Sequence, residues 1–203
     1  QKGVDIHDVP VDYDVQFGIP SKKIIEIAEA NDFDLIVMGI RDKLNFMTKI
    51  SGTTATSVMN HANIPTIMVH ADSPIALPQK IAFAFDKKKD LDDGIEAFKK
   101  INNHLLSRTE FIHVTQEQEN KYMNLTETVN VLFDGSDLNF AFDVKNLHSD
   151  NLLQKLYDYC LAEKIDLLTM IHKKDGIIDL MLNRSKTIKT AYDFHIPLLV
   201  LPN

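Results

Sequence analysis

The sequence predicts an α/β fold in which parallel strands are joined by helical crossovers. Three observations indicate it. Short apolar runs of strand length alternate with longer stretches whose apolar residues recur at helical spacing, and this alternation favours parallel strands. Several apolar runs are uninterrupted, as in strands covered on both faces. The same order of elements also occurs twice along the 203 residues, in register when the chain is shifted by 132 positions.

The first set of elements lies within residues 12–70. An alternating apolar and polar pattern predicts its opening strand, and Pro20 suits the first turn of the helix that follows. Consecutive apolar residues predict two buried strands around a second helix. In chain order we expect a strand at 13–17, a helix at 21–30, a strand at 35–38, a helix that begins near Thr53 and ends before Asn63, and a strand at 67–69.

The second set is longer and contains every element of a five-stranded unit. Asp90 is a plausible N-cap for its first helix, because a carboxylate there accepts hydrogen bonds from the first backbone N–H groups. In chain order we expect a strand at 80–86, a helix at 91–105, a strand at 111–114, a helix within 117–132, a strand at 138–144, a helix through 152–160, a strand at 166–171, a helix at 187–194 and a strand at 198–201.

Sequence identities support a tandem duplication. The segment DLIVM at 34–38 aligns with DLLTM at 166–170, and Ile64-Pro65 aligns with Ile196-Pro197. We therefore expect three parts along the chain. They are a first unit at 1–72, a linker at 73–79 and a complete second unit at 80–203.

Composition excludes several classes of function. The net charge of -7 argues against a nucleic-acid partner, which needs a concentrated positive field. No apolar run approaches the roughly 20 residues of a membrane helix, so we expect no membrane and a cytoplasmic location. The single cysteine, Cys160, lies on an apolar helical face and reads as a core thiol. The eight histidines lack metal-ligand spacing, and we expect neither a metal site nor catalytic residues.

The stretch around the third and fourth predicted elements carries a motif. It runs DLIVMG, then a loop, then GT, then VMNHANIPTIMVH. It resembles the C-terminal half of a universal stress protein domain, whose signature is Gly-x2-Gly-x9-Gly-[Ser/Thr] followed by a His-Ala pair and a Pro-containing strand entry. The matching residues are Gly39, Gly52, Thr53, His61, Ala62 and Pro65, whereas Asp42 occupies the place of the middle glycine.

This resemblance extends to the second unit and implies a fold. There Asp86 ends the first strand as the family's adenosine-side aspartate does, and residues 112–114 resemble its second strand. The family's architecture is a Rossmann-like open parallel sheet of strand order 3-2-1-4-5. We therefore expect two such sheets, the first incomplete, with the units paired through their last strands as a homodimer or pseudo-dimer. A regulatory protein partner is also expected.

In some family members ATP binds beyond the carboxyl ends of the strands, where ligands sit in open α/β sheets. Glycines let the backbone approach a phosphate, and a helix N-terminus offers N–H groups to it. The resemblance places such a site in the first unit, with magnesium if ATP is bound. Its expected residues are Gly39, Arg41, Gly52, Thr53 and Thr54.

An ordinary loop is the competing interpretation of these glycines. A carboxylate at Asp42 about 5 Å from a phosphate charge would repel it by roughly 3 kcal/mol at an effective dielectric of about 20. That is about two orders of magnitude in affinity, although a magnesium ion would convert Asp42 into a ligand. In the second unit Ile171, Lys174 and Arg184 replace the three glycines, and we expect no ATP there.

The first unit lacks the first strand, first helix and second strand of its family. We therefore expect that this chain is a fragment or that a partner supplies the missing strands, because a strand at 13–17 would otherwise lack neighbours. Three functions remain open. They are a nucleotide-binding stress protein, a nucleotide-free dimeric interaction scaffold on the same fold, and an adenine-nucleotide-using enzyme.

Overall fold

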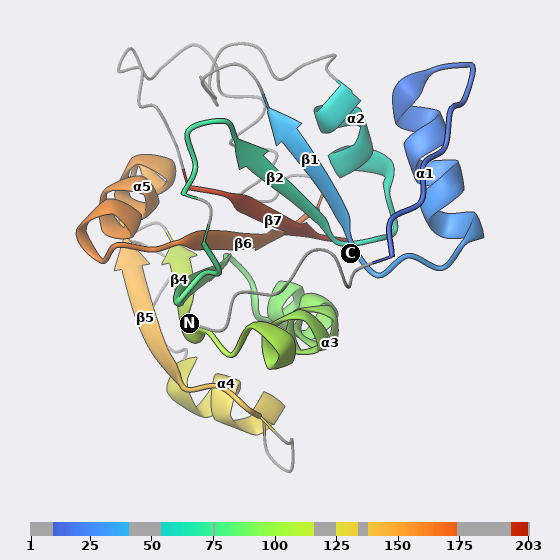
Figure 1. Ribbon diagram of the computed structural model, residues 1–203. Coiled ribbons are helices and arrows are strands. Elements are labelled where there is room, and N and C mark those ends of the chain that lie inside the picture. Colours follow the sequence, from blue (N-terminus) through green and yellow to red (C-terminus); the bar gives the residue numbers. More distant parts are fainter. Residues whose placement is uncertain are drawn as a thin grey trace.

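A computed structural model describes residues 10–40, 54–74, 76–115, 125–133, 138–173 and 196–202. Its centre is one seven-stranded sheet with the order β1-β2-β7-β6-β3-β4-β5 (Figure 1). The strands are β1 (Ile36–Ile40), β2 (Thr66–His70), β3 (Lys80–Phe85), β4 (Arg108–Thr115), β5 (Phe142–His148), β6 (Leu167–Ile171) and β7 (Leu198–Leu201). The helices are α1 (Pro20–Ala30), α2 (Thr54–His61), α3 (Lys88–Leu105), α4 (Leu125–Phe133) and α5 (Leu152–Ala162).

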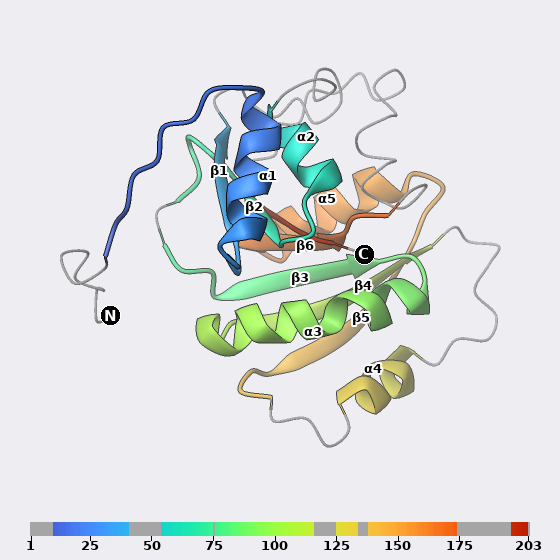
Figure 2. The same ribbon diagram turned by 90° about the vertical axis from the view of Figure 1, so that its right-hand side faces the viewer.

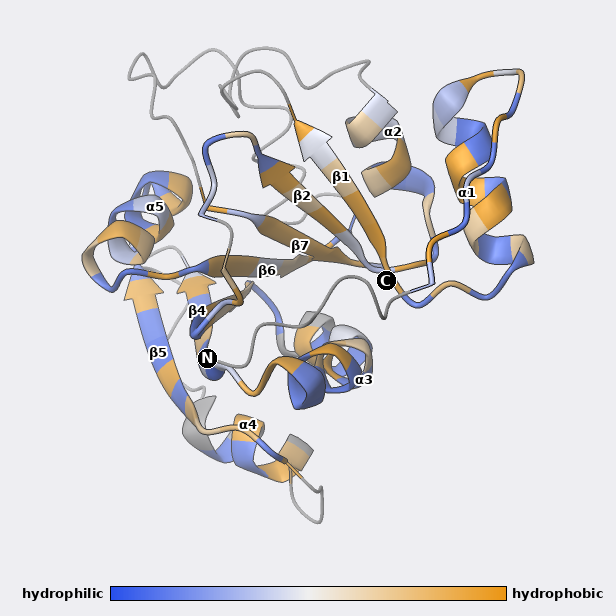
Figure 3. Ribbon diagram, viewed as in Figure 1, coloured by the Kyte–Doolittle hydropathy of each residue, from blue (hydrophilic) through white to orange (hydrophobic). Residues whose placement is uncertain are grey.

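The described helices cover the sheet in two layers. Helices α1, α2 and α5 lie on one face, and α3 and α4 lie on the other, as the side view in Figure 2 shows. Strands β6 and β7 are buried along their whole length, which explains why their sequences are apolar apart from Thr169 in β6. In Figure 3 these strands are mostly hydrophobic, whereas the edge strand β5 mixes hydrophobic and hydrophilic residues.

All neighbouring strands are parallel except β2 and β7, which pair antiparallel. Within residues 80–201 the strands follow one another as β5-β4-β3-β6-β7. When these strands are numbered in chain order within that unit, their order in the sheet is 3-2-1-4-5, as the family resemblance implied. The antiparallel pair joins Thr66 to Val200 and Met68 to Leu198. The two expected sheets are therefore one continuous sheet, joined through β2 and β7.

The strand expected at 13–17 was wrong. Residues 10–17 have no regular secondary structure, and the apolar side chains of the segment are exposed, with Tyr13 at 92% and Phe17 at 94%. An alternating pattern fits a strand surface, but a strand also needs a neighbour for its backbone groups, and no described strand lies beside this segment.

Two boundaries also differ from expectation. Helix α3 begins at Lys88 with Lys87 as N-cap, so Asp90 lies inside the helix and does not cap it. The strand expected at 138–144 lies later in the chain, at Phe142–His148. Phe140 precedes the strand, and its side chain is buried in the core between the sheet, α3 and α4. The helix expected at 187–194 lies outside the described residues.

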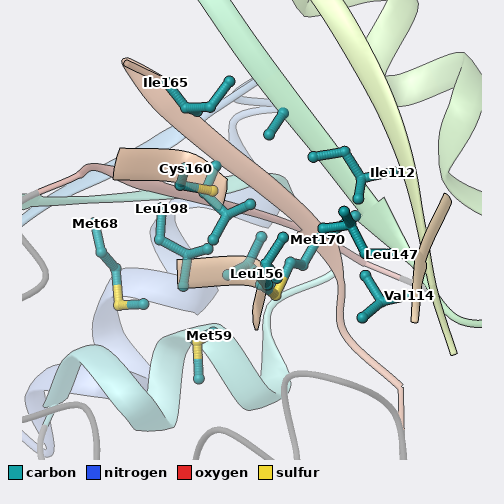
Figure 4. Packing of buried hydrophobic residues seen from close by; sticks show 14 of the residues in the cluster. Met59, Met68, Ile112, Val114, Leu147, Leu156, Cys160, Ile165, Met170 and Leu198 are labelled. Atoms are coloured by element: carbon teal, nitrogen blue, oxygen red, sulfur yellow. The ribbon is translucent and has the colours of Figure 1, made fainter. Parts of the chain in front are cut away.

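Two large hydrophobic clusters fill the space between sheet and helices. The cluster beneath α5 contains Cys160, Leu156 and Met170 (Figure 4). Cys160 is fully buried, which confirms that it is a core residue. Burial, with the negative charge of Glu110 adding to it, raises the pKa of the Cys160 thiol to about 12. The opposite cluster holds the aromatic side chains packed between α3, α4 and the sheet.

Helix α3 approaches the sheet closely at Gly94. A Cβ at this position would lie 2.5 Å from Ile171 Cδ1 and 2.7 Å from Ile171 Cγ1. The absence of a side chain at Gly94 therefore sets the distance between α3 and strands β6 and β7.

Elements separated by 132 positions correspond between the two halves. When 132 is added to its residue numbers, helix α1 at 20–30 coincides with α5 at 152–162. By the same shift β1 overlaps β6, and β2 overlaps β7, to within one residue at each end. Both α1 and α5 cover the same face of the sheet. This relation lets each side chain of the first half be compared with a defined position in the second.

Candidate functional site

The candidate phosphate motif falls on the residues that connect β1 to α2 in the sequence. Strand β1 ends, and α2 begins, at the carboxyl edge of the parallel strands β1 and β2. The structure describes two of the five expected site residues. Gly39 is the penultimate residue of β1, and Thr54 is the first residue of α2. Arg41, Gly52 and Thr53 lie outside the described residues. A strand that ends at such an edge and a helix that begins there are the framework on which open α/β sheets bind ligands.

Gly39 adjoins open space. A Cβ built on it would meet no described atom within 4 Å. Successive side chains of a strand alternate between its faces, so this space lies on the same face of β1 as Val37. Val37 is itself 63% exposed. The open space therefore belongs to an uncovered face of the sheet and is not by itself evidence for a phosphate cradle.

Two histidines end the elements that follow the candidate motif, and they have different roles. His61 ends α2, and its Nδ1 donates a hydrogen bond to the Ser57 backbone oxygen at 2.8 Å, as expected for a residue at a helix end. His70 ends β2, pairs in register with Ile40 and is buried. The Asp72 N–H donates to His70 Nδ1 at 3.1 Å, so neutral His70 carries its proton on Nε2. Sequence analysis assigned no site role to His70, because a single polar residue after an apolar strand is a weak signal.

The carboxyl edge of the second unit contains a buried histidine that sequence analysis also missed. His113, on β4, is 4% exposed. Its Nε2 lies 3.0 Å from the Asp86 backbone oxygen, and its Nδ1 lies 3.1 Å from Asn146 Oδ1 on β5. His113 thus joins the ends of β3, β4 and β5. Only the pairing of β4 with β5, which sequence spacing does not reveal, brings these residues together.

The opposite, amino edge of the sheet carries an ionic network. Glu110 is 4% exposed and accepts a hydrogen bond from Tyr159 Oη at 2.7 Å. Lys80 Nζ lies 2.9 Å from Glu110 Oε1 and 2.8 Å from Glu163 Oε2. Asp166 Oδ2 accepts the backbone N–H groups of both Gln79 and Lys80 at 2.9 Å. These contacts connect β3 and β4 to α5.

The network shifts the pKa values of its members. Desolvation opposes the charge on Lys80, but hydrogen bonds to Glu163 and Glu110 outweigh it and raise the pKa of Lys80. Burial, followed by the hydrogen bond to Glu110, raises the pKa of Tyr159. The hydrogen bond and charge of Lys80 lower the pKa of Glu163. Each polar group here is occupied by a neighbour in the fold, and this edge is therefore structural.

Across the described ranges, no three His, Cys, Asp or Glu side chains gather as a metal-binding group. None of the helices in those ranges combines the length and apolarity that crossing a membrane requires.

Residues 1–70 match the model of the universal stress protein family. No curated protein sequence matches the chain.

Solved structures share the fold. A universal stress protein from Archaeoglobus fulgidus matches with a TM-score of 0.65 and 16% identity, covering 91% of this chain and 65% of its own. A candidate universal stress protein from Pseudomonas aeruginosa UCBPP-PA14 matches with a TM-score of 0.56 and 14% identity, over 92% of this chain and 69% of its own. A functionally unknown Pseudomonas aeruginosa protein matches with a TM-score of 0.54 and 12% identity, over 92% and 69%. The chain thus spans about two thirds of the length of these relatives.

Proposed function

We propose that the chain is a non-catalytic, cytoplasmic stress-response module of the universal stress protein family whose first unit binds ATP. The match of residues 1–70 to the model of that family supports the proposal. The supporting observation is the placement of Gly39 and Thr54. They flank one loop at the carboxyl edge of parallel strands, where the family motif places its phosphate contacts. Arg41, Gly52 and Thr53 complete the proposed site. Magnesium would accompany the nucleotide and offset the charge of Asp42.

The second unit is proposed to lack ATP. The position equivalent to Gly39 is Ile171, which is buried against α3 and close to Gly94. Its backbone therefore carries a branched side chain where the family motif has glycine. The remaining replacements, Lys174 and Arg184, lie outside the described residues.

A tandem duplication accounts for the architecture. It explains the correspondence of α1 with α5 at a separation of 132 residues, and it makes the β2 and β7 pairing a pseudo-dimer contact within one chain. Both edges of β2 are then occupied, by β1 and by β7. A homodimer or a regulatory partner would therefore use another surface. The nucleotide-free interaction scaffold on the same fold is the second candidate function and is the one left if ATP does not bind.

Calorimetric titration with ATP, with and without magnesium, tests the nucleotide site. Without magnesium, Asp42→Gly should bind about 100-fold more tightly than wild type, since a repulsion of roughly 3 kcal/mol is removed. With magnesium, this gain should shrink or reverse.

Asp32→Gly is the matched control. It makes the same charge change at the amino edge, where Asp32 has a φ of 52° that glycine tolerates. Its affinity should equal that of wild type. Absence of heat from both wild type and Asp42→Gly would refute ATP binding and favour the scaffold. Binding by Asp42→Gly alone would identify a site that this chain has lost. Release of inorganic phosphate during the titration would instead support the enzyme hypothesis.

A further inference from the structure

Strand β5 is the outer strand of the second unit (Figure 1). It pairs with β4 along residues 142–148, and no described strand lies along its other edge. The order 3-2-1-4-5 ends at this strand, so the five-stranded unit has no further strand to add there. The outer edge of β5 therefore offers backbone N–H and C=O groups to a strand of another molecule.

The hydrogen bonds to β4 show which backbone groups point outward. The Thr109 N–H donates to the Ala141 oxygen at 2.9 Å, and the Ser149 N–H donates to the Thr115 oxygen at 3.2 Å. In a strand the N–H and C=O of one residue point to the same side, and successive residues alternate. The odd-numbered residues of β5 therefore face β4. The residues that turn their backbone groups to the outer edge are Phe142, Val144 and Asn146.

The charges of β5 suit antiparallel pairing with a second copy of the same strand. A two-fold axis through Val144 places this residue opposite its own counterpart, and it places Asp143 opposite Lys145 of the second copy. Because the backbone groups of Val144 point outward, the two Val144 residues form a hydrogen-bonded pair. Asp143 and Lys145 then occupy non-hydrogen-bonded pairs, in which side chains approach more closely.

A shift of the axis by one residue removes this complementarity. An axis through Asp143 places two carboxylates opposite each other, and an axis through Lys145 does the same with two ammonium groups. Like charges directly opposite each other are destabilising. Arg108 contacts Oδ2 of Asp143, and Lys145 of the second copy can therefore bind at Oδ1. The strand thus favours the register centred on Val144.

We propose that this chain forms a homodimer through β5, in which the strands of two copies pair antiparallel about a two-fold axis at Val144. The contact joins two seven-stranded sheets into one continuous sheet. Backbone hydrogen bonds of the outward-facing residues and two Asp143–Lys145 ion pairs between the copies stabilise it. This inference goes beyond the function proposed above, since neither ATP binding nor the tandem duplication enters it. A negative calorimetric result leaves it standing.

Sedimentation velocity of the full chain over a range of concentrations tests the dimer. The wild type should form a dimer whose fraction rises with concentration. Asp143→Lys and Lys145→Asp each place like charges opposite each other at both pairs, so each should raise the dimer dissociation constant about tenfold or more. Lys22→Asp is the matched control. It makes the same charge change on an exposed residue of α1, in the other half of the chain, and should dimerise as the wild type does.

An equal mixture of Asp143→Lys and Lys145→Asp distinguishes lost pairing from lost folding. In a heterodimer of the two variants every pair again joins opposite charges. The mixture should therefore recover the dimer, although neither variant forms it alone at the same concentration. Recovery requires that both variants are folded, and circular dichroism of each checks this separately.

Oxidative crosslinking locates the axis. In a hydrogen-bonded antiparallel pair the two Cα atoms lie about 5.5 Å apart, within the range that a disulfide spans. Val144→Cys should therefore form a covalent dimer under mild oxidation. In the same dimer the two Cα atoms at position 145 lie roughly 7–8 Å apart, beyond that range. Lys145→Cys should therefore crosslink at least about tenfold more slowly. Cys160 is buried in both variants and contributes equally to each.

Four results would overturn the proposal. A wild type that stays monomeric at every concentration would show that β5 does not pair with itself. A dimer that persists in both charge-reversal variants would place the contact on another surface. Two monomeric variants that fail to associate when mixed would refute the opposition of Asp143 and Lys145. Crosslinking of Lys145→Cys as fast as Val144→Cys would refute the position of the axis.

Discussion

Helix α3 approaches the sheet closely at Gly94, and replacement of this residue by alanine is a sensitive test of the packing described above. The new Cβ would lie 2.5 Å and 2.7 Å from two atoms of Ile171 and 3.3 Å from Leu201 Cδ1. Ile171 and Leu201 are both buried, at 6% and 0% exposure, so neither side chain can turn into solvent. Either α3 or the two strands must move.

Two effects of opposite sign decide the magnitude. Overpacking a close-packed core by a methyl group costs about 1–3 kcal/mol. Alanine in place of glycine within a helix contributes about 0.5–1 kcal/mol in return. Gly94→Ala should therefore lower the free energy of unfolding by up to about 2.5 kcal/mol.

The change in unfolding free energy caused by Gly94→Ala should reverse its sign when Ile171 is replaced by alanine. Ile171→Ala removes both atoms that the methyl group would strike, at its own cost of about 2–5 kcal/mol. In that background Gly94→Ala should stabilise by at most about 0.5–1 kcal/mol, because the gain in helix propensity is then opposed among the described contacts only by Leu201 Cδ1 at 3.3 Å.

Urea unfolding of the wild type, the two single variants and the double variant measures this coupling. Stabilisation by Gly94→Ala in the wild-type background, or additive effects in the double variant, would refute the close contact between α3 and β6.

Three further predictions concern side chains of the core and surface. Thr169→Val should raise the free energy of unfolding by about 1 kcal/mol and raise the urea midpoint. The reason is that the Thr169 hydroxyl is buried without a hydrogen-bond partner among the described residues. A lowered midpoint would contradict this prediction. Cys160 should resist a disulfide reagent at pH 8 until urea unfolds the chain, because burial raises its pKa to about 12; labelling of the native protein within seconds would show an open core. The hydrogen bond and charge of Lys100 lower the pKa of Asp34 below its ordinary 3.8, so this ion pair stabilises the fold above pH 3.8 and its contribution is lost as the pH falls through the lowered pKa. The difference in unfolding free energy between wild type and Lys100→Met should therefore vanish in acid, and a difference independent of pH would contradict the assignment.

Most elements could be predicted from the sequence because local patterns determine them. The apolar run at 198–201 coincides with β7, and Pro20 marks the first turn of α1 as expected. In these places burial on both faces, or a fixed backbone angle, leaves a direct signature in the residue order.

Features that depend on a distant neighbour could not be predicted in the same way. Residues 13–17 have the alternation of a strand, but pairing requires a second strand that no local pattern reports. The contact of His113 with Asp86 and Asn146 arises from the adjacency of β3, β4 and β5. For the candidate site, sequence analysis located Gly39 and Thr54 at the ends of one loop, and the roles of Arg41, Gly52 and Thr53 stay predictions.

The antiparallel contact of β2 with β7 has a consequence for synthesis of the chain. Thr66 meets Val200, a residue added to the nascent polypeptide 134 positions later. At translation rates of about 5–20 residues per second, the edge of β2 that pairs with β7 stays without its partner strand for about 7 to 27 seconds. During this time the free edge of β2 can pair with a nascent chain on a neighbouring ribosome of the same messenger RNA. Slowing elongation between β2 and β7 should therefore increase aggregation more than slowing it after β7.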